Sequence, residues 1–191
     1  MTFTEDPLAA LLGGFDPTAD NRLVFSDYST LGRNGNFAKL PLLVGNTFNE
    51  AGFFKILALA GGDNFTEIQW AAFNIAIFQC GSRQAAQYRV QNGVDVWRYL
   101  YVGNFSNVEL TIPPSGSYHT SEIPIVWGTA GFATGLADTP AESATSQYLM
   151  HLWALFAQDP SSLTQDLGLP QYSPDSKYHP FQPLWLRRYV Y

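Results

Sequence analysis

Residues 40–50 read LPLLVGNTFNE, a short apolar run that ends in a glycine and a polar turn. The run over residues 40–44 predicts a strand that is buried on both faces, as strands of parallel sheets are. From residue 49 to residue 59 the apolar side chains recur at steps of three and four, which indicates a helix. A buried strand that leads directly into a helix is typical of α/β folds.

The rest of the chain continues this alternation. Helical spacing of apolar residues returns over residues 66–91, and residues 94–102 are rich in β-branched and aromatic side chains, which predicts a second strand. Thr139 is followed by Pro140 and, three positions on, by Glu142, a capping box that predicts a helix to about Gln158. The order of elements favours an α/β class with a largely parallel sheet.

Turn-forming residues dominate both ends of the sequence. The first forty residues contain repeated glycine, proline and asparagine, which predicts a loop-rich segment. Prolines and glycines recur from Pro160 onward, and residues 185–191 are an aromatic end that could form a last strand or a tail. A length of 191 residues fits one domain, and we expect residues 1–191 to form one unit.

Composition excludes several classes of protein. With 46% hydrophobic and 14% charged residues, the chain has enough apolar material for a core and is not a disordered sequence. The formal net charge is −6 and the basic residues are scattered, so a nucleic-acid partner is not expected. No apolar run approaches eighteen residues, so we expect no membrane span.

Two features bear on the cellular compartment. The first residues carry no basic region and no apolar stretch, so we expect no signal peptide in the sequence as given. The sequence nevertheless contains N-glycosylation sequons at Asn64 and Asn104, which are used only in secreted proteins. Its one cysteine, Cys80, cannot form an internal disulfide. That thiol indicates a reduced compartment, a disulfide partner outside this chain, or a small core residue.

Glu50 and His119 each follow a predicted strand, in the position where α/β sheets hold ligands and catalytic groups. A carboxylate can fix the tautomer of an imidazole and stabilise its cation, which lets the histidine act as a general base. The acid precedes the histidine, as in α/β hydrolases. A metal site is not predicted, because His119 and Glu122 would need further ligands and the other histidines, His151 and His179, belong to other segments.

Three segments carry a resemblance to a known family. Residues 35–54 resemble the acid-bearing segment of the type-B carboxylesterases, the family of cholinesterases and fungal lipases. Residues 119–128, HTSEIPIVWG, are similar to the histidine segment of that family, and residues 96–101 resemble the strand before it. The resemblance runs from about residue 20 to about residue 160.

The resemblance implies a fold and an activity. The fold would be the C-terminal part of an α/β-hydrolase fold, an incomplete, mostly parallel sheet with flanking helices. Glu50 matches the triad acid, His119 the triad base, and Glu122 an acidic residue of structural role. The implied reaction is hydrolysis of small-molecule or lipid esters through a serine acyl-enzyme, with no metal or organic cofactor. The aromatic residues that flank the two motifs are expected to line the substrate pocket: Phe53, Phe54 and Trp127.

The family's nucleophile lies on a G-x-S-x-G turn upstream of the acid, and no such motif occurs in this sequence. We therefore expect a fragment, a truncated product or a degenerate relative that is inactive alone, lacks the N-terminal part of the fold, and derives from an extracellular parent. One alternative is a non-catalytic binding or adhesion protein on an esterase-like scaffold. Another is an independent α/β domain of unrelated function, although a strand buried on both faces needs more neighbours than this chain supplies.

Overall fold

A parallel pair of strands forms the centre of the molecule in the computed structural model, which describes residues 17–110 and 114–174. Strand β1 (Leu42–Thr47) pairs with β2 (Val96–Tyr101), with Leu42 opposite Val96 and Thr47 opposite Tyr101. The predicted parallel sheet is confirmed. Strand β1 lies two to three residues later than predicted, since Pro41 has no amide hydrogen and the first bond comes from the Leu42 N–H to the Asp95 carbonyl.

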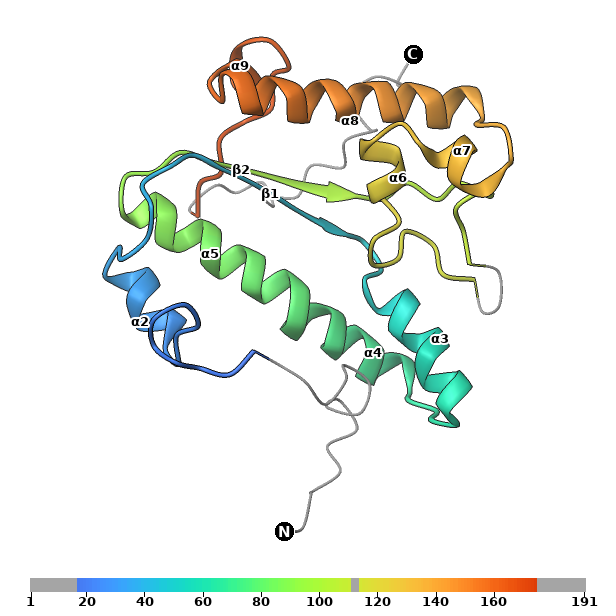
Figure 1. Cartoon of the computed structure of the whole chain (residues 1–191), viewed down its shortest axis with the longest axis horizontal. Helices are drawn as coiled ribbons and strands as arrows, with labels where there is room; N and C mark the ends of the chain where they lie inside the picture. The colour runs from blue at the N-terminus through green and yellow to red at the C-terminus, as the bar shows by residue number, and fades with distance from the viewer. Residues whose placement is uncertain (1–16, 111–113, 175–191) are drawn as a thin grey trace.

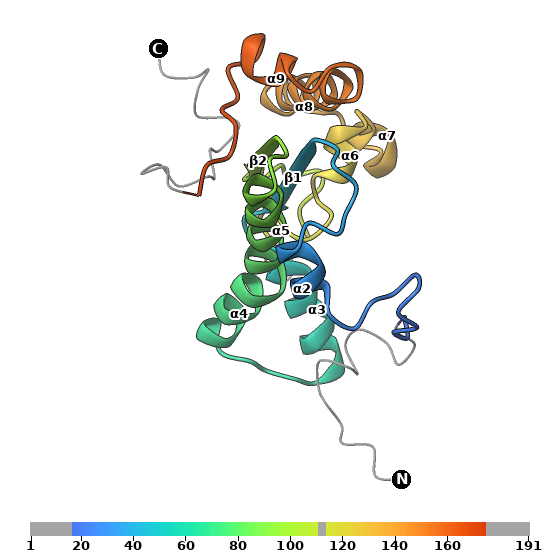
Figure 2. The same ribbon diagram turned by 90° about the vertical axis from the view of Figure 1, so that its left-hand side faces the viewer.

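Helices cover both faces of the sheet, as Figures 1 and 2 show for α8 (Pro140–Gln158) above and α5 (Cys80–Gln91) below. On the α8 face, Leu43 and Trp97 pack in one cluster with Leu149 and Leu152. On the α5 face, Val96 packs against Ala86. This three-layer order explains why the run that leads into β1 is apolar on two faces.

The remaining helices are short or lie at the ends of the sheet. Their bounds are α2 (Tyr28–Arg33), α3 (Ala51–Gly61), α4 (Glu67–Phe73), α6 (Ile123–Val126), α7 (Ala130–Thr134) and α9 (Ser162–Gln165), and a π-helix, η1 (Asn74–Gln79), joins α4 to α5. The helices predicted over residues 49–59, 66–91 and 139–158 are confirmed. The π-helical turn within the second of them was not predicted.

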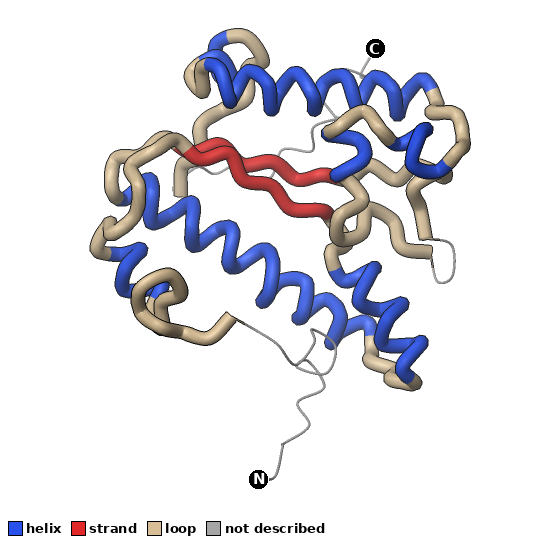
Figure 3. Tube along the Cα trace, in the orientation of Figure 1, coloured by secondary structure: helices blue, strands red, loops and turns tan. Residues whose placement is uncertain are grey.

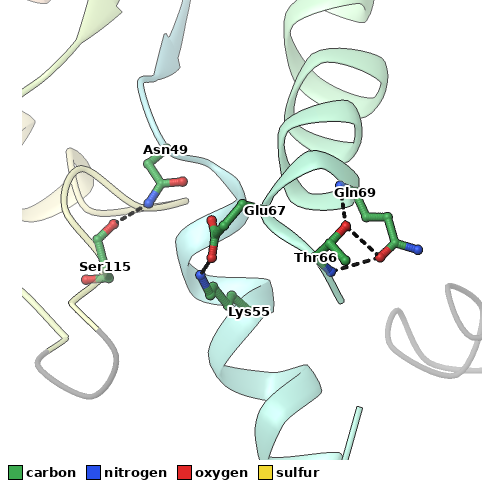
Figure 4. A network of polar contacts seen from close by, with 6 residues as sticks. All are labelled: Asn49, Lys55, Thr66, Glu67, Gln69 and Ser115. Atoms are coloured by element: carbon green, nitrogen blue, oxygen red, sulfur yellow. Dashed lines mark hydrogen bonds and ion pairs between the residues drawn. The ribbon is translucent and has the colours of Figure 1, made fainter. Parts of the chain in front are cut away.

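Helix starts follow from capping side chains. The capping box of α8 is present: the Thr139 side chain accepts from the Glu142 N–H, and the Glu142 carboxylate accepts from the Thr139 N–H. Thr66 and Gln69 form a second capping box at the start of α4 (Figure 4). Helix α2 lies in the segment that we expected to be rich in loops, and no helix was predicted there. It forms where Asp27 caps its start by accepting from the Thr30 N–H.

Two further expectations from the sequence can be compared with the structure. Cys80 is exposed, so its interpretation as a small core residue is wrong. Within the described part of the chain, no helix is long and apolar enough to cross a membrane. The possible strand or tail over residues 185–191 lies outside the described residues.

Candidate active site

The two strands end at the same edge of the sheet, and Figure 3 shows the loops that leave them there. Strand β1 ends at Thr47, and Glu50 follows at the position just before α3. The chain after β2 runs through a longer loop to His119. Parallel pairing therefore brings both predicted site residues to one end of the sheet.

Hydrogen bonds from Asn49 hold these two loops together. Its backbone N–H donates to the Ser117 carbonyl over 3.0 Å, and its side-chain amide donates to the Ser115 carbonyl over 2.7 Å (Figure 4). A bridge in parallel orientation pairs Asn49 with Tyr118. Since Glu50 follows Asn49 and His119 follows Tyr118, the bridge sets the two functional groups side by side.

Glu50 and His119 form a hydrogen-bonded pair. Glu50 Oε2 lies 2.7 Å from His119 Nδ1, while Glu50 Oε1 accepts a 2.7 Å hydrogen bond from the Thr47 N–H. The Glu50 side chain is 5% exposed and that of His119 is 38% exposed. Both oxygens of the buried carboxylate thus have donors, as a buried charge requires. Because the carboxylate accepts from Nδ1, Nε2 is the ring nitrogen that can exchange a proton with another group.

The backbone turns sharply directly after the histidine. Thr120 has a φ of 77°, in the left-handed region that β-branched residues rarely adopt. Such strained residues persist where the surrounding structure holds them, and they concentrate at functional sites. The Ser121 N–H closes this turn on the Tyr118 carbonyl over 2.9 Å.

Aromatic rings lie against the imidazole of His119. The ring centroids of Phe54 and Phe78 are 5.4 and 4.9 Å from that of His119. Phe53 instead stacks on Tyr118 at 6.5 Å, and Trp127 is 72% exposed at the end of α6. Of the three aromatic residues predicted to line a pocket, the structure brings only Phe54 to the imidazole. Phe78 was missed because nothing in the sequence links residues of η1 to His119.

Glu122 is half-buried near the same pair. The pKa of its carboxyl is raised, chiefly because burial disfavours the charged form. A hydrogen bond from its own backbone lowers this pKa, the charge of Glu50 raises it, and His119 lowers it. Its Oε2 atom has no hydrogen-bond partner among the described residues. Burial raises the pKa of Tyr99 and Tyr101, and the Glu122 charge adds to both shifts, so Glu122 belongs to a buried polar group beside the sheet.

Known proteins provide an independent comparison. No protein-family model matches the chain. It is 33% identical over 162 residues to Secreted lipase 5 of Gibberella zeae. This match covers 80% of the present chain and 30% of the lipase. It is 31% identical over 147 residues to chlorogenic acid esterase of Aspergillus niger, covering 77% of this chain and 28% of the esterase. The chain thus spans about three tenths of the length of these relatives.

Solved structures provide a comparison of the fold. Two structures of PNB esterase match with TM-scores of 0.59 and 0.56, at 18% and 20% sequence identity. In both, the match covers 75% of this chain and 34% of the esterase. The predicted α/β-hydrolase class is therefore confirmed, and the small parallel sheet with flanking helices corresponds to part of that fold. Together, these comparisons show that the chain is similar in sequence to part of a secreted lipase and of a chlorogenic acid esterase, and similar in fold to part of PNB esterase.

Proposed function

We propose that this chain supplies the acid and the base of a serine-type carboxylic ester hydrolase, with Glu50 as the acid and His119 as the base. The observation that supports this most is the 2.7 Å hydrogen bond between the buried Glu50 carboxylate and His119 Nδ1. A carboxylate held in this way fixes the imidazole tautomer and stabilises the imidazolium that forms during catalysis.

The proposed chemistry follows from that tautomer. His119 Nε2 takes the proton of a serine hydroxyl while the serine oxygen attacks the carbonyl carbon of the ester. When the tetrahedral intermediate collapses, the same nitrogen gives the proton to the departing alcohol oxygen and leaves an acyl-serine. A water molecule, deprotonated in turn by His119, then attacks the acyl-serine and releases the carboxylic acid, and the proton returns to the serine.

The serine is assigned to sequence outside these 191 residues, because the chain contains no G-x-S-x-G motif. The partner would be the remaining part of the same fold. This assignment is supported by the length of the relatives and by the sheet, in which β1 and β2 pair only with each other among the described residues. Alone, the chain lacks both nucleophile and oxyanion donors, and each such donor contributes about 3 kcal/mol to transition-state stabilisation. We expect the isolated chain to be inactive.

The substrate class is a carboxylic ester with an apolar group next to the scissile bond. Phe54 and Phe78 make the surroundings of His119 apolar, and apolar rings favour apolar acyl or alcohol groups over charged ones. The names of the two relatives, a lipase and a chlorogenic acid esterase, are consistent with such esters. That Phe53 and Trp127 line the substrate pocket stays a prediction.

The activity is tested on the native gene product, whose mass is measured first with an antibody against this segment. The product is then assayed for hydrolysis of 4-nitrophenyl esters and for labelling by a fluorophosphonate, which reacts only with an activated serine. Removing the base by His119→Ala should lower kcat by about 10⁴-fold or more, and Glu50→Gln should lower it by about 10³-fold or more.

His151→Ala serves as the matched control, because His151 is an exposed histidine on α8 and its loss should leave kcat unchanged. A folded native product that neither hydrolyses esters nor binds the fluorophosphonate would refute the proposed function. Full esterase turnover after His119→Ala would refute the role of that residue.

We further propose that the parent protein is extracellular and carries N-linked glycans at Asn64 and Asn104. Both asparagines are exposed and lie outside helices and strands, Asn64 between α3 and α4 and Asn104 after β2. An acceptor asparagine must be accessible in this way. Expression in a secretory host should give two glycans, and Asn64→Gln and Asn104→Gln should each remove one, as read by mass spectrometry before and after enzymatic deglycosylation. An unmodified secreted product would contradict both sites.

A further inference from the structure

The long helical segment that runs from α4 through η1 to α5 changes its pitch in the middle. Residues 74–79 form a π-helix, in which backbone bonds join residues five apart. Phe73 directly precedes this turn, and Phe78, five residues further on, lies within it. In an α-helix of 3.6 residues per turn, residues at that spacing point to different sides. The wider π turn brings them back to one side.

The contacts of the two rings show the result. The ring centroid of Phe54 lies 5.2 Å from that of Phe73 and 5.8 Å from that of Phe78. Phe73 and Phe78 are themselves 5.9 Å apart in an edge-to-face arrangement. All three rings therefore form one packed group, and Phe78 is its member closest to His119, at 4.9 Å and 45°.

Polar side chains fix the π turn against the end of β1. The Asn74 amide donates to the Phe48 carbonyl over 3.2 Å, and the Asn46 amide donates to the Phe78 carbonyl over 3.4 Å. Asn46 in turn accepts a 2.5 Å hydrogen bond from the Ser82 hydroxyl. Phe48 and Asn46 lie two and four positions before Glu50 in the chain. The turn that holds the acid and the turn that holds Phe78 are thus parts of one bonded unit.

We propose that Phe78 is a positioning residue for His119, placed for that purpose by the π turn. The hydrogen bond to Glu50 fixes Nδ1 but leaves the imidazole able to pivot about that atom, and 38% of the side chain is exposed. The rings of Phe78 and Phe54 limit the pivot and exclude water from the Nδ1 bond. The effect of Phe78 on the Glu50–His119 hydrogen bond does not depend on the proposed function. Its effect on catalysis does.

The test is NMR spectroscopy of the full 191-residue chain with labelled histidine. The Nδ1 proton of His119 should be observed at low field and should be absent in Glu50→Gln. In Phe78→Ala we expect this resonance to be lost to exchange with water and the His119 ring resonances to shift. Phe78→Tyr, which keeps the aromatic ring, should restore both signals, whereas Phe78→Leu should not restore them.

Phe65→Ala is the control, because Phe65 belongs to the same aromatic cluster but packs edge-to-face on Trp70, 5.3 Å away. It should leave the His119 signals unchanged. If Phe78→Ala does not fold, as judged by circular dichroism, the Phe78→Leu chain decides the question. A folded variant without the Phe78 ring that keeps the wild-type Nδ1 resonance overturns the proposal.

The catalytic consequence is measured separately on the native gene product. Phe78→Leu should lower kcat while KM changes little, and Phe78→Tyr should recover kcat. If the NMR effect is present and no protein form hydrolyses esters, the positioning stands and the proposed function fails. If hydrolysis is normal and the resonance is insensitive to Phe78, the positioning fails and the proposed function stands.

Discussion

The side-chain amide of Asn49 donates a 2.7 Å hydrogen bond to the backbone carbonyl of Ser115, across 66 positions of sequence. Gly52 makes this approach possible, because a Cβ atom there would lie 2.6 Å from the same carbonyl oxygen. The contact joins the start of the acid-bearing helix to the loop that leads to His119. The geometry of the Glu50–His119 pair therefore depends on residues that do not belong to it.

Asn49→Ala is predicted to loosen this pair. The change leaves the Ser115 carbonyl without its donor, which should cost about 1–3 kcal/mol of unfolding free energy in urea denaturation. The low-field Nδ1 resonance of His119 should also broaden, since the loop that carries the histidine is no longer fixed. Asn92→Ala is the matched control: it removes a 2.8 Å amide bond to the Tyr88 carbonyl, remote from the pair. A sharp wild-type resonance in Asn49→Ala would contradict the prediction.

Gly45→Ala is predicted to disturb the centre of the sheet. The added Cβ would lie 2.2 Å from the Tyr99 ring, which packs edge-to-face on Trp153 of α8. Displacing a ring that is 5% exposed should cost about 1–3 kcal/mol of unfolding free energy. Tyr99→Leu should reduce that cost, and a double-mutant cycle measures the coupling.

Gly81→Ala should change the unfolding free energy in the opposite direction and serves as the control. Gly81 lies in the first turn of α5, and a Cβ there would meet nothing within 4 Å. Replacing a helical glycine by alanine should therefore raise the unfolding free energy by about 0.5–1 kcal/mol. If Gly45→Ala and Gly81→Ala had similar effects, the packing of Tyr99 over β1 would not be the cause.

Local sequence signals predicted most of the fold. Strand β1 starts in a continuous apolar run, β2 is rich in β-branched and aromatic residues, and the helix that starts at Thr139 has a capping box. Each element is therefore specified by residues close together in the chain. Helix α2 escaped prediction because its cap, Asp27, stands among turn-forming residues. The π turn escaped it as well, since its cause is the tertiary fit of Phe73 and Phe78 and no local pattern specifies it.

The candidate site was predictable only in part. Glu50 and His119 could be named because each follows a strand, and parallel pairing brings the two strand ends together. Phe78 comes from a helix between the strands, and its place beside the imidazole depends on how that helix packs. Trp127 is 72% exposed among the described residues, and its place in a substrate pocket stays a prediction.

Thr139→Ala is predicted to weaken α8, the helix that covers one face of the sheet. The change removes the acceptor for the Glu142 N–H and should cost about 1 kcal/mol of unfolding free energy. Thr139→Ser keeps the hydroxyl and should retain most of the wild-type stability in the same thermal or urea denaturation. Equal loss in both variants would mean that the Thr139 methyl group, and not the cap, carries the effect.

The stability of the protein should depend on pH through Glu122. Burial raises the pKa of this carboxyl in the folded state, so the unfolded chain loses its proton first as the pH rises. Between the ordinary carboxyl pKa, about 4.3, and the raised value, the folded state binds more protons, and stability falls with increasing pH. Glu122→Gln removes this dependence and should gain stability over wild type through that interval.

The measurement is urea denaturation of wild type and each variant from about pH 2 to pH 8, read as the difference in unfolding free energy at each pH. Asp159 provides a comparison of opposite sign, because hydrogen bonds from Ser161 lower the pKa of its carboxyl. Wild type should therefore gain stability over Asp159→Asn as the pH rises through the acidic range. A difference between wild type and Glu122→Gln that does not change with pH would mean that Glu122 ionises equally in both states, and burial would then not control its charge.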